Sequence, residues 1–377
     1  MRIGIEGKVL TRHIGGIGRY AINLLQSMLT IAATERPNLE FVIFSAPQTD
    51  PAILRSFKAT SCHHFRSVKS SLLRSSLLLP AGVVIEGLDL FHGLDQSGIP
   101  FFFKRGKCVV TLHDILPCVL PWAFPRSHRL VSRFAFSRVC QQADIILVPS
   151  NAVKTDVLEY FHIDEHRIVV IPLGCEEHFR PMGDPAQAEA VRKRYQLPEC
   201  YMLFLGTLEP RKDVVTLLQA FALMRAKQLE ADIKLVIAGG HGWGHPEALN
   251  TCNSLRLGDA VVFTGFVDED DLPDLYRGAQ LFVYPSLSEG FGLPIVEAMA
   301  CGVPVITSNV SSMPEVAGQA ALLVEPKQPE ALAATMASVL CDEPLRHHLR
   351  EKGLERARCF SWQDVARRTL DVYTTLL

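Results

Sequence analysis

The sequence predicts an α/β protein with two doubly wound parallel sheets, each in its own domain. Short apolar runs alternate with amphipathic stretches along the whole chain, as expected for β/α repeats with buried strands. The alternation forms two successive series, and a polar, proline-containing stretch lies between them. With 377 residues, the chain is also too long for a single typical core, so two domains are expected.

Each series can be divided into strands and helices by its apolar pattern. The strands expected in the first half span residues 2–6, 39–45, 88–91, 108–112, 144–149 and 167–171. Those expected in the second half span residues 201–206, 233–238, 260–264, 280–284, 303–307 and 321–324. Helical patterns lie between most of them, for example over 17–33, 126–142, 213–229, 293–301 and 329–340.

The boundary between the two series falls near residues 174–181. The last strand of the first series ends just before this stretch, and Pro181, Gly183 and Pro185 follow in polar surroundings. The final segment, 361–377, has a helical pattern, and Ser361 suits its N-cap.

Composition and charge exclude several classes of protein. Nearly half of the residues are hydrophobic, which indicates a packed globular chain, and the net charge of −2 argues against a nucleic-acid partner. Residues 2–6 already have a strand pattern, so no signal peptide is expected, and no apolar run is long enough to span a bilayer. The ten cysteines are scattered without a close CxxC pair. A cytoplasmic protein with free thiols is the simplest interpretation.

The most informative string runs from Ser288 to Glu297, where Glu289 and Glu297 lie eight positions apart across a glycine-rich turn. Pro294 suits the start of a helix, and Cys301-Gly302 suits its end. Carboxylates can bind sugar or ribose hydroxyls, and the free N–H groups of the turn can bind phosphate. Considered separately, Glu297 could simply interact favourably with the positive end of the helix dipole, and Glu289 could be a solvated loop residue. The string as a whole favours a ligand site.

Three further motifs follow expected strands at the end where parallel sheets bind ligands. Gly15-Gly16 opens a helix, where it could approach a phosphate or form a tight structural turn. His113-Asp114 ends a buried strand, and His113 could contact a ligand or be a packing residue. Arg211 and Lys212 lie in the loop that begins at Gly206, and they could stabilise negative charge developing on a leaving group or form a solvated pair.

Two glycine- and serine-containing loops and one acidic run are less specific. Gly239 follows a strand and could lie beside a nucleotide. In Ser308–Glu315, the hydroxyls could bind sugar or nucleotide, or Ser311 or Ser312 could cap a short helix. The acids at 268–271 suit a solvated first helical turn, so no metal site is predicted.

The string Ser288–Glu297 resembles the signature of the retaining glycosyltransferases of family GT4, which have the GT-B fold. The resemblance extends over essentially the whole chain, although its specific motifs lie mostly in the second half. It implies an N-terminal acceptor-binding domain of residues 1–176 plus 361–377, because the last helix crosses back in GT-B proteins. Residues 177–360 would form the C-terminal donor-binding domain.

The resemblance also assigns roles to the motif residues. Glu289 would lie near the donor sugar and Glu297 would bind the ribose, while the backbone of Phe291, Gly292 and Leu293 would follow the diphosphate and sugar. His113 would contact the donor sugar, and Gly15 and Gly16 would close over the diphosphate. Arg211 and Lys212, beside Gly206, would bind the phosphates, and Gly239 would lie beside the nucleotide. Many relatives carry Arg where Thr207 stands, which leaves Arg211 and Lys212 as the main phosphate cations.

The motifs look most like those of bacterial α-mannosyltransferases of polysaccharide assembly. They favour GDP-mannose as the donor substrate, no cofactor or metal, and a glycan or lipid-linked saccharide as acceptor. UDP-glucose and UDP-N-acetylglucosamine are the alternative donors, and a GT-B-like epimerase or a non-catalytic nucleotide-sugar binding protein are the alternative classes. Residues 66–79 and 101–107 mix apolar and basic positions. They could make peripheral contact with the inner face of the cytoplasmic membrane, or they could be ordinary core helix and loop.

Overall fold

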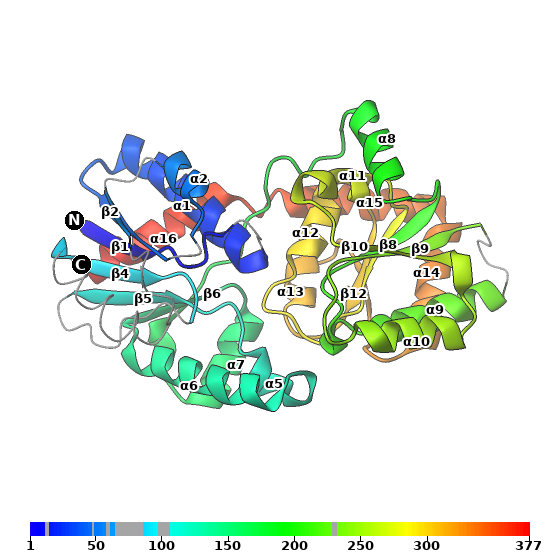
Figure 1. The fold of residues 1–377 in the computed structure, drawn as a ribbon, viewed down its shortest axis with the longest axis horizontal. Helices are drawn as coiled ribbons and strands as arrows, with labels where there is room; N and C mark the ends of the chain where they lie inside the picture. Colours follow the sequence, from blue (N-terminus) through cyan, green and yellow to red (C-terminus); the bar gives the residue numbers. More distant parts are fainter. Residues whose placement is uncertain (12–14, 47–48, 58–60, 65–85, 97–105, 228–231) are drawn as a thin grey trace. The chain divides into compact units, whose positions relative to one another are not determined.

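The structure is a computed structural model of the chain. It describes residues 1–377 except 12–14, 47–48, 58–60, 65–85, 97–105 and 228–231. The chain forms two compact units, one of Met1–Gly174 with Ser361–Leu377 and the other of Cys175–Phe360. Each unit is an α/β domain around its own sheet (Figure 1).

The N-terminal unit contains a parallel sheet of seven strands in the order β3-β2-β1-β4-β5-β6-β7. The strands are β1 (Arg2–Glu6), β2 (Glu40–Ser45), β3 (Ser61–His64), β4 (Leu90–Gly93), β5 (Lys107–Thr111), β6 (Ile145–Val148) and β7 (Ile168–Val170). Its helices are α1 (Gly16–Glu35), α2 (Pro51–Ser56), α5 (Leu116–Val119), α6 (Arg126–Gln142), α7 (Asn151–Phe161) and α16 (Trp362–Leu376). The crossovers place α1 on one face of the sheet and α6 and α7 on the other (Figure 1).

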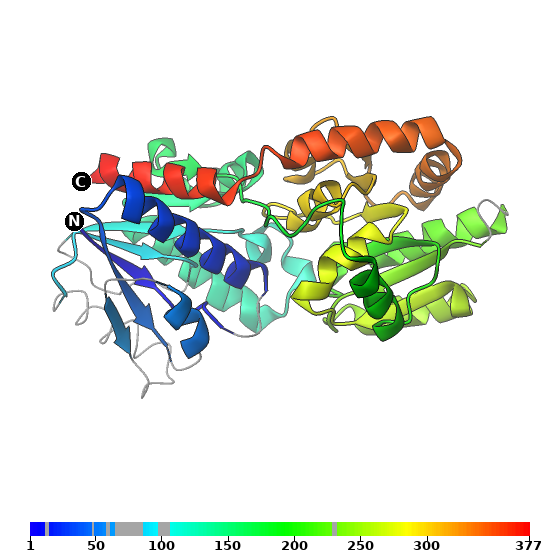
Figure 2. The same cartoon turned by 90° about the horizontal axis from the view of Figure 1, so that it is seen from above.

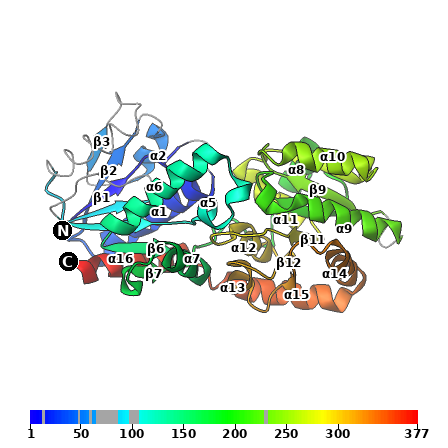
Figure 3. The ribbon, with the colours of Figure 1, turned by 90° about the horizontal axis from the view of Figure 1, so that it is seen from below.

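The C-terminal unit repeats this topology with six parallel strands in the order β10-β9-β8-β11-β12-β13. The strands are β8 (Tyr201–Leu205), β9 (Lys234–Ala238), β10 (Val261–Gly265), β11 (Leu281–Tyr284), β12 (Val305–Ser308) and β13 (Leu322–Val324). The helices are α8 (Pro185–Arg194), α9 (Val214–Ala226), α10 (His245–Ser254), α11 (Leu272–Arg277), α12 (Leu293–Ala300), α13 (Met313–Ala317), α14 (Pro329–Cys341) and α15 (Glu343–Ala357). Helices α9 and α10 lie side by side (Figure 3).

The last helix, α16, packs against α1 in the N-terminal unit (Figure 2). Ser361 caps it by accepting a hydrogen bond from the Gln363 N–H. Arg367 pairs with Glu35 of α1 through two contacts of 2.5 and 2.6 Å. The apolar face of α16 is buried, and Tyr373 is completely enclosed. The expected return of the final segment to the N-terminal domain is therefore confirmed.

Two local features differ from the sequence-based expectation. The edge strand β3 was not predicted, because Ser61–His64 lacks the apolar run by which the other strands were recognised. Helix α12 begins at Leu293, so Pro294 occupies its second position, where a missing N–H is equally harmless. Gly302, with φ of 75°, follows its end, as the Cys301-Gly302 pair predicted.

The strand order fixes where each unit can bind a ligand. In both sheets the order reverses beside the first strand, between β1 and β4 and between β8 and β11. Loops that leave neighbouring strands in opposite directions open a crevice at the carboxyl ends of such strands. The loops after β5, β8 and β11 carry the His113, Arg211–Lys212 and Glu289 motifs.

Candidate functional site

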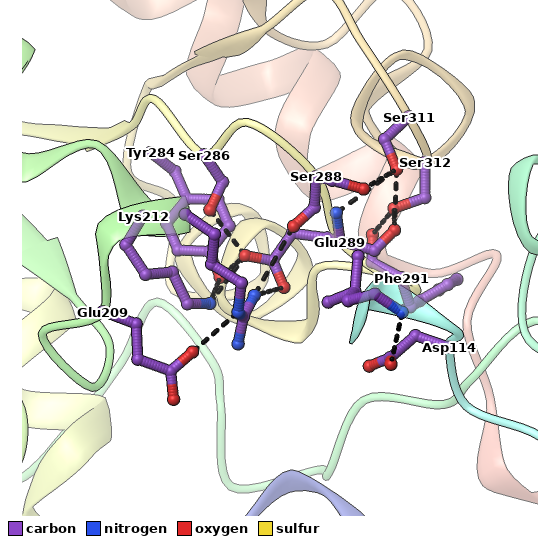
Figure 4. A network of polar contacts seen from close by, with 12 residues as sticks. Asp114, Glu209, Lys212, Tyr284, Ser286, Ser288, Glu289, Phe291, Ser311 and Ser312 are labelled. Carbon is purple, nitrogen blue, oxygen red and sulfur yellow. Dashed lines mark hydrogen bonds and ion pairs between the residues drawn. The ribbon is translucent and has the colours of Figure 1, made fainter. Parts of the chain in front are cut away.

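A buried polar cluster surrounds Glu289 in the loop after β11 (Figure 4). One carboxylate oxygen, Oε1, lies 2.6 Å from Lys212 Nζ and accepts hydrogen bonds from Tyr284 at 2.9 Å and Ser286 at 2.5 Å. The other oxygen, Oε2, lies 2.9 Å from Arg211 Nη1. The ends of β8 and β11 thus contribute to a single carboxylate whose residue is only 8% exposed.

The charges of this cluster balance. Arg211 also donates to Glu209 through its Nε at 2.7 Å, so the two cations face two carboxylates. Lys212 donates to Tyr284 as well and is 6% exposed. The interpretation of Arg211 and Lys212 as a solvated pair is therefore wrong, because both side chains are largely enclosed and salt-bridged.

The pKa values follow from this arrangement. Burial alone would raise the pKa of Glu289, but the charges of Arg211 and Lys212 outweigh it and lower that pKa to about 2. Burial lowers the pKa of Lys212, and the Glu289 carboxylate opposes that effect. Burial also raises the pKa of Tyr284 well above its ordinary value, so its hydroxyl stays protonated and donates to Glu289.

Two serines of the loop after β12 hold the backbone of the Glu289 loop. Ser311 and Ser312 donate to the carbonyl oxygen of Glu289 at 2.8 and 3.0 Å. Ser312 is also 2.7 Å from the carbonyl oxygen of Phe291, and Ser311 accepts from the Glu289 N–H at 3.2 Å. Ser312 is the N-cap residue of α13, but its side chain makes no capping hydrogen bond. These hydroxyls therefore bind the adjacent loop.

The turn after Glu289 delivers free backbone donors at the start of α12. Gly292 has φ of 107°, a conformation that favours glycine, and it is the N-cap residue. The first N–H groups of a helix have no intrahelical acceptor, so those at Gly292 and Leu293 are available to an anion. Phe291 is 5% exposed and packs edge-on against Phe360, with ring centroids 5.6 Å apart.

The second glutamate of the string lies in a different environment from the first. Glu297 is on the second turn of α12, is 1% exposed and accepts a hydrogen bond from the Tyr276 hydroxyl at 2.8 Å. Tyr276 belongs to α11, so a helix residue binds this carboxylate, whereas loop and strand-end residues bind Glu289.

The glycine motifs of the C-terminal unit bring three loops together without room for side chains. A Cβ on Gly239 would lie 2.1 Å from the carbonyl oxygen of Gly206, and Gly239 has φ of 137°. Gly206 donates to Ala238 at 2.9 Å, and Gly239 donates to Gly265 at 2.8 Å. The loops after β8, β9 and β10 therefore form one hydrogen-bonded rim, and glycine at position 239 is required by that close approach.

In the N-terminal unit, His113 lies at the carboxyl end of β5 with its ring fixed. Its Nε2 is 3.0 Å from the carbonyl oxygen of Leu94, and its ring packs edge-on against Tyr20 at 4.7 Å. Because a carbonyl can only accept, Nε2 carries the hydrogen. Burial lowers the pKa of His113, so the ring is neutral and its Nδ1 is an acceptor at neutral pH.

A chain of buried hydrogen bonds lies beneath His113. Tyr20 contacts Thr111 at 2.7 Å, Thr111 contacts His92 Nε2 at 2.9 Å, and His92 Nδ1 contacts Tyr373 of α16 at 2.5 Å. Burial lowers the pKa of His92 to about 3, so this ring is also neutral. The last helix thus supports the strand that carries His113.

Gly15 and Gly16 form the start of α1 and are exposed. A Cβ on either residue would meet nothing within 4 Å, and neither has positive φ. Packing of the described residues therefore does not require glycine at these positions.

The stretches 66–79 and 101–107, for which the sequence allows membrane contact, lie wholly or mostly outside the described residues. Among the described helices, none is long and apolar enough to cross a membrane.

Sequence reasoning missed two polar residues of the Glu289 cluster. Tyr284 and Ser286 orient the Glu289 carboxylate, yet each resembles an ordinary strand-end or turn residue in the sequence. The string Tyr284-Pro285-Ser286 directly before the signature is the available signal. In the part of the chain that the structure describes, no three His, Cys, Asp or Glu side chains are grouped to hold a metal ion.

The duplicated sheet order and the charged strand-end loops define a two-domain glycosyltransferase, and the chain belongs to glycosyltransferase family 4 with the GT-B fold. Residues 14–178 match the Glycosyltransferase Family 4 description, and residues 188–356 match that of Glycosyl transferases group 1. The chain is an enzyme of this family, as the resemblance implied.

Two relatives from Escherichia coli carry more specific names. The O-antigen chain mannosyltransferase B is 31% identical over 391 residues, which cover both chains completely. The serotype-specific mannosyltransferase WbdA is 31% identical over 307 residues, which cover 78% of this chain and 37% of that protein.

Solved structures share the fold over the full length. Anabaena HepE, in complex with UDP and glucose, superposes with a TM-score of 0.78 at 20% identity and covers 100% of both chains. Sucrose-phosphate synthase from Thermosynechococcus elongatus has a TM-score of 0.77 at 22% identity over 100% of this chain and 99% of that one.

Proposed function

We propose that this glycosyltransferase moves mannose from GDP-mannose to a glycan or lipid-linked saccharide in polysaccharide biosynthesis. The observation that carries the proposal is the full-length match, at 31% identity, to a mannosyltransferase that acts on O-antigen chains. The chemistry of the two strand-end sites supports it, because one offers cations and backbone donors for a diphosphate and the other offers an imidazole acceptor.

The proposed reaction retains configuration at the anomeric carbon. The bond from that carbon to the diphosphate oxygen breaks, and the acceptor oxygen forms the new bond on the same face. The acceptor proton passes to the departing phosphate oxygen, and GDP leaves. In this scheme, no carboxylate needs to act as a nucleophile. Glu289, with its pKa near 2 and both oxygens bound, is suited to hold hydroxyls as a permanent anion and not to exchange protons.

Charge on the leaving group would be stabilised by residues of the C-terminal unit. Arg211 and Lys212 are fixed by Glu209 and Glu289 before any ligand binds, so little reorganisation accompanies the reaction. The N–H groups at Gly292 and Leu293 add donors at a helix N-terminus. Gly206 and Gly239 shape the rim on which the nucleotide would rest.

His113, Gly15, Gly16 and Glu297 would contact the sugar, the diphosphate and the ribose of the donor. Nδ1 of His113 would accept a hydrogen bond from a donor-sugar hydroxyl, while its Nε2 remains bound to Leu94. Gly15 and Gly16 would allow the backbone to approach the diphosphate. Glu297 would bind the ribose, which requires the ribose hydroxyl to share or displace its Tyr276 partner.

The first experiment is calorimetric titration of the purified protein with GDP and with UDP, both in EDTA. Preferential binding of GDP, followed by consumption of GDP-mannose only when a mannosylated acceptor is added, would support the proposal. Preferential binding of UDP would replace GDP-mannose with UDP-glucose or UDP-N-acetylglucosamine as donor, in line with the UDP and glucose bound by HepE. Turnover of the donor without an acceptor would instead indicate the epimerase alternative.

Site substitutions separate catalysis from binding. Glu289→Gln and Lys212→Met are expected to abolish transfer, whereas Tyr276→Phe is expected to weaken GDP binding without abolishing turnover. Binding of the nucleotide with no turnover by the unaltered protein, on any acceptor, would favour a non-catalytic binding protein.

A further inference from the structure

The turn that begins α12 is supported from two sides at Phe291. The Phe291 carbonyl oxygen accepts a hydrogen bond from the Ser312 hydroxyl at 2.7 Å (Figure 4). The Phe291 ring packs edge-on against Phe360, with ring centroids 5.6 Å apart, and the two phenylalanines are 5% and 8% exposed. Because Phe291 directly precedes Gly292 and Leu293, these contacts fix the backbone from which the free N–H groups at the helix start project.

The first support of Phe291 leads to Arg356 of α15. The Nε of Arg356 donates to the carbonyl oxygen of Val316 at 2.9 Å, and its Nη2 donates to that of Glu315 at 2.8 Å. Both carbonyls belong to α13, and Ser312 is the N-cap residue of that helix. Arg356 therefore holds the helix from which the Ser312 hydroxyl reaches Phe291.

The second support of Phe291 depends on the same guanidinium group. The central carbon of the Arg356 guanidinium lies 4.8 Å from the centroid of the Phe360 ring. A cation at that distance is attracted to an aromatic face, which favours one orientation of the Phe360 ring against Phe291. The main chain of Phe360 is held as well, because its carbonyl oxygen accepts a hydrogen bond from the Cys175 N–H at 3.0 Å.

Capping of α13 alone would be an ordinary role for an arginine near the C-terminal end of a helix. Arg346, also on α15, has such a role, because it donates to the carbonyl oxygens of Val339 and Leu340 near the end of α14. Arg356 differs in that its planar guanidinium donates hydrogen bonds and also lies over the Phe360 ring. An ammonium group could keep the charge of Arg356 but could not reproduce both contacts.

We propose that Arg356 and Phe360 are positioning residues for the diphosphate-binding turn at Phe291–Leu293. In this role neither residue touches the donor. They hold the backbone N–H groups of Gly292 and Leu293 in the places where diphosphate oxygens would bind. The assignment of the diphosphate to this turn rests on the proposed function, whereas the support of the turn by Arg356 and Phe360 does not.

The test compares Arg356→Lys and Phe360→Leu with the unaltered full chain by calorimetric titration with GDP and with UDP. We expect about tenfold weaker binding of the diphosphate that the unaltered chain prefers, because small displacements of positioned groups carry large costs. Binding of guanosine or uridine should change by less than about twofold, because a nucleoside lacks the phosphates that helix N–H groups bind. Equal weakening of nucleoside and diphosphate binding would indicate a role in folding alone and would overturn the proposal.

Matched controls carry the same substitutions elsewhere in the C-terminal unit. Arg346→Lys changes the arginine that binds the end of α14, and Phe221→Leu changes a fully buried phenylalanine of α9. Both controls should keep diphosphate binding within about twofold of the unaltered chain, because they do not contact the turn. Equal losses in the controls and the test variants, or unchanged diphosphate binding in both test variants, would also contradict the proposal.

Amide hydrogen exchange of peptides that cover residues 288–297 provides a readout that needs no ligand. Exchange in this turn should be faster in Arg356→Lys and Phe360→Leu than in their controls. If the unaltered chain binds neither GDP nor UDP, the donor assignment fails while the exchange measurement still decides this inference. Equal exchange rates in the test and control variants would refute the positioning role.

Discussion

The salt bridge between Lys212 and Glu289 allows a quantitative test of the cluster at the end of β11. Its perturbation is a double-mutant cycle with Lys212→Met, Glu289→Gln and the combined variant. Association with the two cations lowers the pKa of Glu289 from 4.5 to about 2 despite burial. At about 1.4 kcal/mol per pKa unit, the ionised form gains about 3 kcal/mol from the fold.

That figure predicts strongly non-additive costs. Removing either partner leaves a buried charge without its counterion, and each single variant should lose about 3 kcal/mol in free energy of unfolding. The combined variant removes both charges of the pair. Its loss in free energy of unfolding should therefore be about 2 kcal/mol smaller than the sum of the two single losses. Because the pKa of Glu289 is lowered, its contribution is present above pH 4.5 and is lost as the pH falls toward 2. The cycle is therefore measured near neutral pH.

The assay must report on the C-terminal unit alone, because two units need not unfold together. Native-state hydrogen exchange of peptides that cover β8, an interior strand, measures the opening of this unit. The matched control is the exposed pair Lys352–Glu355, with 3.3 Å between its charged atoms, for which coupling below about 0.5 kcal/mol is expected. Additivity within about 0.5 kcal/mol for Lys212 and Glu289 would refute the reasoning.

Three further substitutions test other parts of the structure. Gly239→Ala should destabilise the C-terminal unit by more than about 3 kcal/mol, because its Cβ would lie 2.1 Å from a carbonyl oxygen. The control Gly240→Ala should cost less than about 1 kcal/mol, and equal shifts of the melting temperature in the two variants would contradict this. Burial raises the pKa of Asp156 from 3.8 to about 6, so ionisation of this side chain destabilises the fold as the pH rises through that range. Asp156→Asn should therefore stabilise the fold by about 1–2 kcal/mol near pH 8 and by nothing measurable near pH 3. A stability change that is independent of pH would argue against a titrating carboxylate. Tyr373→Phe should cost about 1–3 kcal/mol in urea denaturation because it leaves His92 Nδ1 buried without its 2.5 Å partner, and an unchanged midpoint would exclude that role.

The sequence was sufficient to predict features that depend on local pattern. The apolar runs identified every described strand except β3, and the glycine and proline positions predicted the turn into α12. The contacts of Glu289 could not be predicted in this way. Lys212 and Ser311 are 77 and 22 positions away in the chain, and only the parallel pairing of β8, β11 and β12 brings the loops together. Hydroxyls such as Ser312 have no sequence signature for holding a neighbouring backbone.

The return of α16 to the N-terminal unit has a consequence for the biosynthesis of the protein. The ribosome makes every strand of both sheets before it makes residues 361–377. Throughout that interval the first unit lacks the helix that covers α1 and supplies Tyr373 to His92. Residues 175–360, in contrast, are contiguous and can complete their core as soon as they emerge. The domain begun first is therefore finished last, and premature termination near residue 360 would leave an intact second domain beside an incomplete first one.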